Sequence, residues 1–279
     1  MLATLIVTLR EGVEAALIIG IILSYLHKIG LEREGRKVWL GTALATVLSI
    51  VGGFGVFLIM GTTTEGLFQQ LLEGFAMLTA VIVLTYMVFW MHGGGKGMTA
   101  SINAKVQAAV SSSSVTALAV LAFVSVLREG VETVLFLIGT TSSSTPGEAL
   151  AGGLLGLIMA VVVGYVVFKS SRKVNIAAFF KWTSVLLLFM AAGMLSNAIG
   201  EFHEANLLPP IAKRIWDTSG FLSEDDFFGG IMMALFGYNS SPSLFQVISY
   251  VSYLAGTMYM FFRTPQKIHS TNGGTQHAE

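Results

Sequence analysis

The chain has 279 residues, of which 54% are hydrophobic and 11% are charged, and its mean hydropathy is +0.74. Soluble domains carry about 25% charged residues, so this composition excludes a soluble globular protein and indicates an all-α integral membrane protein. The 16 basic and 16 acidic residues give no net charge, and the basic ones are scattered, so no nucleic-acid partner is expected. Cysteine is absent, which excludes disulfides, thiolate metal sites and cysteine nucleophiles.

Seven apolar segments are long enough to cross a bilayer, because a spanning helix needs about 20 mostly apolar residues. Connectors rich in helix breakers separate them, including HGGGKG at 92–97, SSSS at 111–114 and TTSSSTPG at 140–147. We therefore predict one transmembrane domain over residues 1–263 and a short, disordered cytoplasmic tail over residues 264–279. The predicted spans cover residues 3–27, 37–60, 67–91, 116–140, 148–169, 179–203 and 243–262.

The distribution of Lys and Arg among the connectors predicts the orientation of these spans. Twelve of them lie in the first, third and fifth connectors and in the tail, against two, Lys213 and Arg214, in the other connectors. Because Lys and Arg are enriched on the cytoplasmic side, the N-terminus is predicted outside and the C-terminus in the cytoplasm. The twelve are Lys28, Arg33, Arg36, Lys37, Lys96, Lys105, Lys169, Arg172, Lys173, Lys181, Arg263 and Lys267.

The sequence LREGVE occurs twice, at residues 9–14 and 127–132, each time inside a long apolar segment. The first span lacks the cationic start of a signal peptide, so we expect it to be retained as a helix. It runs inward and the fourth span runs outward, so the two copies lie on antiparallel helices. Two spans follow each copy. The chain is thus predicted to contain two inverted three-helix repeats plus a seventh helix, an architecture of secondary transporters.

The four glutamates of the two copies are the candidate metal ligands. Residues three apart share one helix face, so Glu11 and Glu14 point the same way, as do Glu129 and Glu132. The first pair lies roughly 12–17 Å into its span and the second roughly 20–24 Å, at 1.5 Å per residue, within a core about 30 Å thick. The pairs can therefore form a ring of four carboxylates. Such oxygen ligands suit iron(III), manganese, calcium or magnesium.

The arginine and the glycine of each copy have predicted supporting roles. We expect each arginine to pair with the second glutamate, one turn along, and each glycine to let another helix approach closely. The alternative is that these ion pairs only fasten helices together. That alternative leaves one glutamate per copy without a purpose, although a charge at the centre of a membrane helix costs about 2.5–3.5 kcal/mol. The supporting residues are Arg10, Arg128, Gly12 and Gly130.

Further acidic residues are expected on the external side and are candidate accessory metal ligands. Glu73 begins the third span, and IGEFHEA at 199–205 closes the sixth with Glu201, His203 and Glu204. The motif charges sum to −2, and Glu73 would bring them to −3, which suits a trivalent cation. Alternatively, Glu73 is an interfacial first-turn residue and His203 is a capping or solvated residue.

A short segment before the seventh span is predicted to lie at the interface or to re-enter the membrane. Residues 223–226 have the pattern of a helix N-cap with acids in the first turn. The apolar run behind them is too short to span. Elsewhere, methionines scattered through the spans indicate packing, and Trp90 near a span end fits an interfacial aromatic belt.

Two intramembrane RExxE motifs in the first and fourth of seven spans, with the N-terminus outside, resemble the oxidase-dependent iron permeases. Within that family the chain is most similar to the bacterial EfeU-type branch. Four further segments carry the resemblance in the same order. They are LTYMVFWM at 84–91, FFKWTS at 179–184, FHEA at 202–205 and FGY at 236–238.

The resemblance implies high-affinity iron import across the bacterial cytoplasmic (inner) membrane by a multi-pass permease rather than an enzyme. It implies that the four motif glutamates are essential, that iron is the transported substrate and that no cofactor is tightly bound. It also implies two extracytoplasmic partners as separate chains: an iron-binding, cupredoxin-containing protein and a haem peroxidase.

The residues leave several alternatives open. The same architecture could move another hard divalent cation such as manganese, or export rather than import. A glutamate pair could instead perform intramembrane acid–base catalysis, or the chain could be a structural scaffold. No P-loop is present, so no ATP site is predicted. The oxidation state of the iron, the energy coupling and the oligomeric state stay open.

Overall fold

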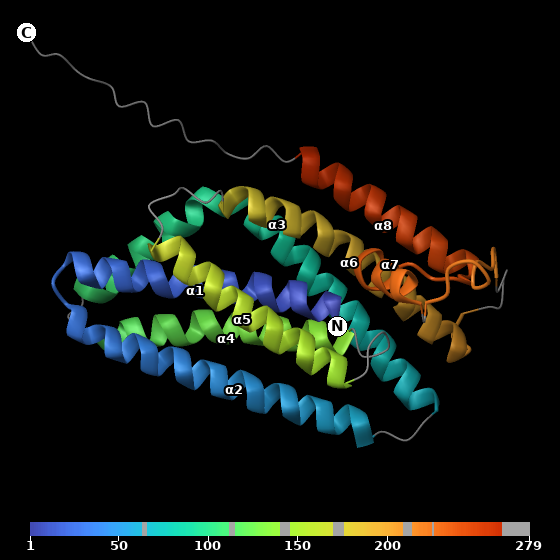
Figure 1. Ribbon diagram of the computed structural model, residues 1–279, viewed down its shortest axis with the longest axis horizontal. Coiled ribbons are helices and arrows are strands. Elements are labelled where there is room, and N and C mark those ends of the chain that lie inside the picture. Colours follow the sequence, from blue (N-terminus) through green and yellow to red (C-terminus); the bar gives the residue numbers. More distant parts are fainter. Residues whose placement is uncertain are drawn as a thin grey trace, which may run out of the picture.

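The computed structural model describes residues 1–62, 66–111, 115–139, 146–169, 176–208, 214–224 and 226–263. Within these ranges the chain forms helices and no strands (Figure 1). A short 3-10 turn, Glu32–Glu34, precedes α2, and α7 is a ten-residue helix, Phe227–Phe236. The long helices are α1 (Leu2–Lys28), α2 (Gly35–Thr62), α3 (Leu67–Ser111), α4 (Val115–Gly139), α5 (Pro146–Lys169), α6 (Ile176–Glu204) and α8 (Leu244–Arg263).

Five helical segments are long and apolar enough to cross a membrane, so the chain is a multi-pass membrane protein. Large apolar side chains on them face outward; Leu150 and Ile82, for example, are 76% and 68% exposed. Outward apolar side chains at this density fit a lipid environment. Helices α1 and α4 are not among the five, since each carries one arginine and two glutamates in its middle. The five segments are Glu32–Gly55, Leu67–His92, Gly147–Val166, Ala178–Glu204 and Leu244–Arg263.

One predicted connector is wrong. HGGGKG at 92–97 was expected to end the third span, but α3 continues through it to Ser111 and is 45 residues long. A glycine in a helix costs only about 1 kcal/mol relative to alanine, and each added residue of a formed helix gains a backbone hydrogen bond. Glycines alone therefore do not stop a helix. The predicted tail, 264–279, and most of the connector 140–147 lie outside the described residues.

Helix α1 packs mainly on α5, and α2 mainly on α4. Gly152 at the start of α5 faces Met1, and Gly164 near its end faces Ala16. Because both numbers rise together, α1 and α5 are parallel. Helices α2 and α4 are parallel for the same reason, since Gly41 of α2 faces Ala119 of α4 and Gly53 of α2 faces Val134 of α4. As α2 turns back from α1, helices α1 and α4 run in opposite directions (Figure 1).

The core consists of two apolar clusters with the repeated motif between them. One cluster joins Ala3 and Val7 of α1 to Phe136 of α4 and to parts of α3, α6 and α8. The other joins the second half of α1, from Ile18 onward, to α2 and to the first half of α4 up to Val126. The motifs at 9–14 and 127–132 fall between these two groups on both helices. A polar layer is thus enclosed between two apolar layers.

Helix α7 ends in the middle of the helical bundle. Its C-cap, Gly237, has a left-handed backbone (φ 65°) and lies against Gly193, near the centre of α6. A ten-residue apolar helix that reaches this depth fits the predicted re-entrant segment. The predicted side-chain cap is not seen: Asp226 is the N-cap residue but makes no capping hydrogen bond. Glu224 instead accepts a 2.7 Å hydrogen bond from the backbone N–H of Ser240 and ties the loop before α7 to the loop after it.

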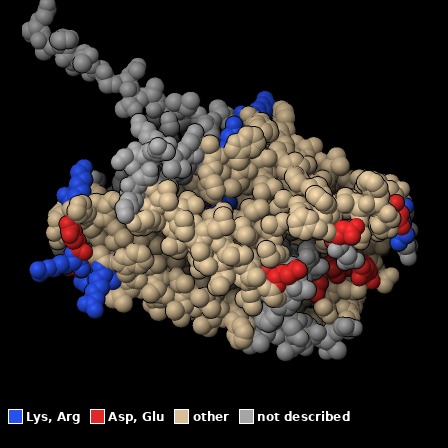
Figure 2. Space-filling view, viewed as in Figure 1, with Lys and Arg blue, Asp and Glu red and all other residues tan. Residues whose placement is uncertain are grey.

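The two ends of the molecule differ in charge. Figure 2 shows Lys and Arg concentrated at the end formed by the α1–α2 connector, and most of the visible Asp and Glu at the opposite end. The connector contributes Lys28, Arg33, Arg36 and Lys37. At the other end, the segment between α6 and α7 contributes Arg214, paired with Asp217 at 2.9 Å. The first connector therefore lies at a basic end of the folded chain, as its charge predicted (Figure 2).

Candidate metal-transport site

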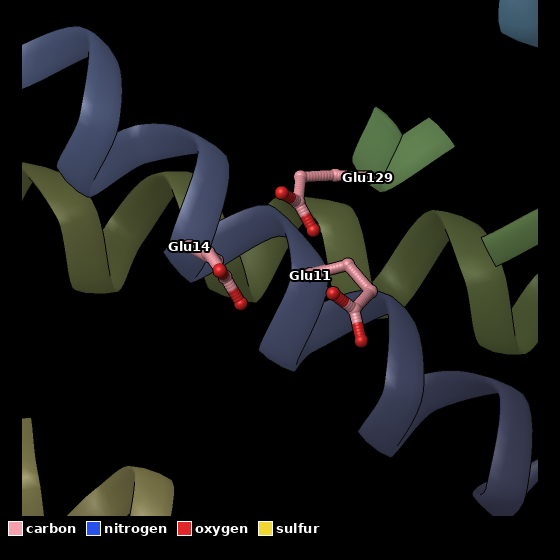
Figure 3. Close-up of side chains that lie close together, drawn as sticks. All are labelled: Glu11, Glu14 and Glu129. Carbon is pink, nitrogen blue, oxygen red and sulfur yellow. The ribbon is translucent and has the colours of Figure 1, made fainter. Parts of the chain in front are cut away.

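Three motif glutamates converge in the polar layer. Glu11 and Glu14 of α1 and Glu129 of α4 each offer a carboxylate oxygen, and these oxygens lie within 4.8 Å of one another (Figure 3). All three residues are buried, with exposures of 2%, 0% and 3%. Carboxylates brought this close out of water repel one another unless cations offset them. The three oxygens are close enough to bind a single cation, with ligands from two helices.

Arg128 holds carboxylates of both helices. Its Nη2 donates to Glu129 Oε1 at 2.7 Å and, across the helix interface, to Glu14 Oε1 at 3.2 Å. Its Nε lies 3.6 Å from Glu132 Oε1. The guanidinium stacks on the Trp90 ring of α3, with 4.9 Å between the Cζ atom and the ring centroid. The Arg128 guanidinium therefore forms ion pairs with three glutamates.

Arg10 is fully buried and has a different set of contacts. Its Nη1 donates to Glu11 Oε1 at 2.6 Å and lies 3.1 Å from the sulfur of Met87. The other terminal nitrogen contacts the sulfur of Met91, and the Cζ atom lies 5.9 Å from the centroid of the Phe180 ring. Arg10 is thus fixed among α1, α3 and α6.

Two predictions about the motif need correction. Arg10 pairs with its neighbour Glu11 and not with Glu14 one turn along, because Glu14 is taken by Arg128 from the other helix. The predicted ring of four carboxylates is a group of three in the described residues, with Glu132 connected to it through Arg128. The antiparallel crossing places residue 14 opposite the start of the second motif, a relationship that spacing along one helix does not reveal.

Each of the four glutamates uses its two oxygens differently. In every case Oε1 faces an arginine nitrogen at 3.6 Å or less. In every case Oε2 is buried and has no hydrogen-bond partner among the described residues. Buried polar atoms are nearly always paired, and leaving one unpaired costs about 1–3 kcal/mol. These four Oε2 atoms are therefore available to a ligand within the polar layer.

The motif glycines admit the neighbouring helices at this level. A Cβ at Gly12 would lie 2.5 Å from the Cβ of Ala160 in α5, and a Cβ at Gly130 would overlap the side chain of Ser49 in α2. Ser49 and Ala160 lie near the middles of their helices. The supporting role predicted for both glycines therefore has a geometric basis, and the two copies use it in the same way.

The accessory candidates lie apart from the three-glutamate group. Glu73 accepts a 2.9 Å hydrogen bond from Gln69 near the start of α3. Glu201 has Glu73 and Glu204 as electrostatic neighbours. Both ring nitrogens of His203 are buried and have no hydrogen-bond partner among the described residues. These residues form a separate acidic region at the end of α6, so Glu73 does not add its charge to the motif glutamates.

Residues on α3 complete the site and were assigned other roles from the sequence. Met87 and Met91 contact the guanidinium of Arg10, although scattered methionines indicated packing alone. Trp90 stacks on Arg128, although its place near a span end suggested an interfacial belt. Arginine over an aromatic face contributes roughly 0.5–2 kcal/mol. The available signal was their clustering within LTYMVFWM, a segment that the resemblance had already marked.

An all-helical membrane protein that encloses carboxylates between antiparallel charged helices has the construction of an ion permease. The chain belongs to the iron permease FTR1 family, whose model matches residues 1–265.

Curated relatives agree with this assignment. The ferrous iron permease EfeU of Escherichia coli O6:K15:H31 (strain 536 / UPEC) is 36% identical over 272 residues, which cover 95% of this chain and 97% of the relative. The protein of the same name from Shigella sonnei (strain Ss046) has the same identity and coverage. The one from Yersinia pestis is 35% identical, with 95% of each chain covered. No solved structure matches the chain.

Proposed function

We propose that the chain imports iron through the buried glutamate group at the crossing of α1 and α4. The observation that carries this proposal is the set of four buried Oε2 atoms, one from each motif glutamate, without a partner among the described residues. They face a layer enclosed by apolar clusters on both sides. A cation bound there is shielded from both aqueous phases, as transport with controlled access requires.

The ion is iron(II) in this proposal. With all six motif side chains ionised, the formal charges of four glutamates and two arginines sum to −2, which balances a divalent cation. Glu73 lies in a separate region, so the trivalent balance that included it loses its support. The relatives are named as ferrous iron permeases. Oxygen ligands also bind manganese(II), so metal selectivity is part of the test.

The proposed architecture is a pair of inverted three-helix repeats with α8 as the additional span. Helix pairing supports it, because the first helix of each repeat packs in parallel on the second helix of the other. The third helices, α3 and α6, also pack on each other. The basic α1–α2 end is assigned to the cytoplasm, which leaves the N-terminus outside in the bacterial cytoplasmic membrane.

Iron is supplied from the external side in this proposal. The resemblance supports two separate extracytoplasmic chains, a cupredoxin-containing iron-binding protein and a haem peroxidase, as the suppliers. Transport itself then needs no tightly bound cofactor, since the motif residues provide all the charge. In this proposal the supplier releases the ion near Glu201, where Glu73 and Glu204 add negative charge.

Reconstitution into proteoliposomes tests the proposal. We expect uptake of radiolabelled iron(II), kept reduced under anaerobic conditions, to disappear when Glu11, Glu14, Glu129 and Glu132 are all changed to Gln. The control is Glu32→Gln, an exposed glutamate at the basic end. Normal uptake by the four-site variant would show that the motif glutamates are not the transport site. Uptake of manganese(II) that iron(II) does not compete with would overturn the choice of metal.

A further inference from the structure

The two motif arginines differ sharply in exposure. The side chain of Arg10 is 0% exposed, whereas that of Arg128 is 41% exposed. The carboxylates that Arg128 holds are themselves buried, at 0% for Glu14 and 3% for Glu129. Among the six charged side chains of the motifs, Arg128 is therefore the one that lies at the open edge of the buried group.

The contacts of Arg128 are those that a cation would need. It faces Oε1 of Glu14, Glu129 and Glu132, on both helices, at 3.2, 2.7 and 3.6 Å. A divalent cation that gathers the same carboxylates is a second positive charge beside the guanidinium. Like charges at this distance in a partly buried site repel strongly. The guanidinium and the ion therefore compete for one set of carboxylates.

Trp90 gives the guanidinium a contact that does not depend on the carboxylates. The ring already lies 4.9 Å from Cζ, and Trp90 is 46% exposed, so this contact lies at the edge of the buried group. Arginine binds an aromatic face without a carboxylate partner. Arg10 has no such freedom, since Glu11 and two methionine sulfurs surround it in the interior.

We propose that Arg128 is a positioning residue that acts as a tethered competitor of the transported cation. It holds Glu14 and Glu129 together across the helix interface while it lies on Trp90. As a divalent cation enters, the guanidinium gives up the carboxylates and keeps its contact with Trp90, and it binds the carboxylates again as the cation leaves. This inference rests on the proposed function. The inference adds that the Arg128 side chain sets the balance between binding and release of the cation. Arg10 stays in place and offsets the charge of Glu11.

The test separates ion binding from ion transport. Iron(II) binding to the purified full chain in detergent is measured by anaerobic equilibrium dialysis, and uptake is measured in proteoliposomes. For Arg128→Gln we expect the Kd to fall about fivefold or more while the rate of uptake falls by a similar factor, because release is lost. Arg128→Lys keeps the charge but loses the planar fork of donors. We expect its Kd and its uptake rate to lie between those of Arg128→Gln and those of the natural chain.

Each outcome has a distinct meaning. Weaker binding in Arg128→Gln, parallel with lost uptake, would assign Arg128 a purely structural role and overturn the proposal. Tighter binding with unchanged uptake would also overturn it. Failure of the natural chain to bind or transport iron(II) would instead contradict the proposed function. The natural chain thus tests the function, and the variants test the role of Arg128.

A second variant applies if Arg128→Gln does not fold. Trp90→Leu removes the contact that would hold the guanidinium once it leaves the carboxylates, so we expect Arg128 to stay on the carboxylates and the Kd for iron(II) to rise. Trp182→Leu, an exposed tryptophan on α6, is the matched control. Equal Kd values for Trp90→Leu and Trp182→Leu would contradict the proposal.

Discussion

Arg128 of α4 donates to Glu14 of α1 over 3.2 Å, so an ion pair between residues 114 positions apart joins the two copies of the repeated motif. The contact exists because the two helices cross in opposite directions at the level of the motifs. It turns two local patterns into one site and ranks the glutamates, since Glu14 is fully buried while Glu132 stands outside the group of three.

That ranking predicts unequal effects of single substitutions. Glu14→Gln and Glu129→Gln each remove one member of the converging group, and we expect each to lower iron(II) uptake about tenfold or more, as for the loss of a charged buried partner. Glu132→Gln should have a smaller effect. Initial uptake rates in proteoliposomes, normalised to reconstituted protein, measure the order. A Glu132→Gln variant slower than Glu14→Gln would show that the ranking is wrong.

The close approach at the motif glycines predicts a compensating pair of substitutions. Gly130→Ala places a methyl group on Ser49, and overpacking of this kind costs typically 1–3 kcal/mol. We expect a lower thermal unfolding temperature in detergent, restored in part when Ser49→Gly is added. Gly12→Ala should likewise lower the unfolding temperature, and adding Ala160→Gly should restore it in part. The control, Gly52→Ala, meets nothing within 4 Å. An equal loss for Gly52→Ala would mean that helix contact is not the cause.

Orientation can be tested directly because the chain has no cysteine, so single cysteines need no altered background. Arg33→Cys marks the basic end and Gly220→Cys marks the segment before α7; both positions are exposed. A membrane-impermeant maleimide should label position 220 in spheroplasts and position 33 only after permeabilisation, as Lys and Arg favour the cytoplasm. The reverse pattern would invert the proposed direction of entry.

The acidic region at the end of α6 should affect capture rather than passage of the ion. Glu201→Gln removes charge near Glu73 and Glu204 but leaves the motif group unchanged. We expect the iron concentration for half-maximal uptake to rise about two- to fivefold at low ionic strength, with the maximal rate nearly unchanged. In about 1 M salt, where the screening length is about 3 Å, the difference should vanish. A fall in the maximal rate would instead place Glu201 on the transport path.

Much of this protein follows from local properties of the sequence. Apolar length identifies membrane helices because a bilayer imposes one dimension, and α1 and α8 lie within one residue of the predicted segments. The spacing of LREGVE places two carboxylates on one helix face. The four Lys and Arg of the first connector predict a basic end, and Figure 2 shows Lys and Arg concentrated there. These features depend on each segment alone and on water, lipid and backbone geometry.

Other features depend on how helices cross, and no local pattern contains that information. Arg10 and Arg128 stand in identical sequences, yet one is buried against methionine sulfurs of α3 and the other lies at an open edge over Trp90. Glu14 pairs across the interface rather than along its own helix. Tertiary packing decides both outcomes, because a helix presents several neighbours with different surfaces. The sequence alone determined that two helices each carry one arginine and two glutamates in an apolar segment. The crossing of α1 and α4 decided which of their carboxylate oxygens lie close together.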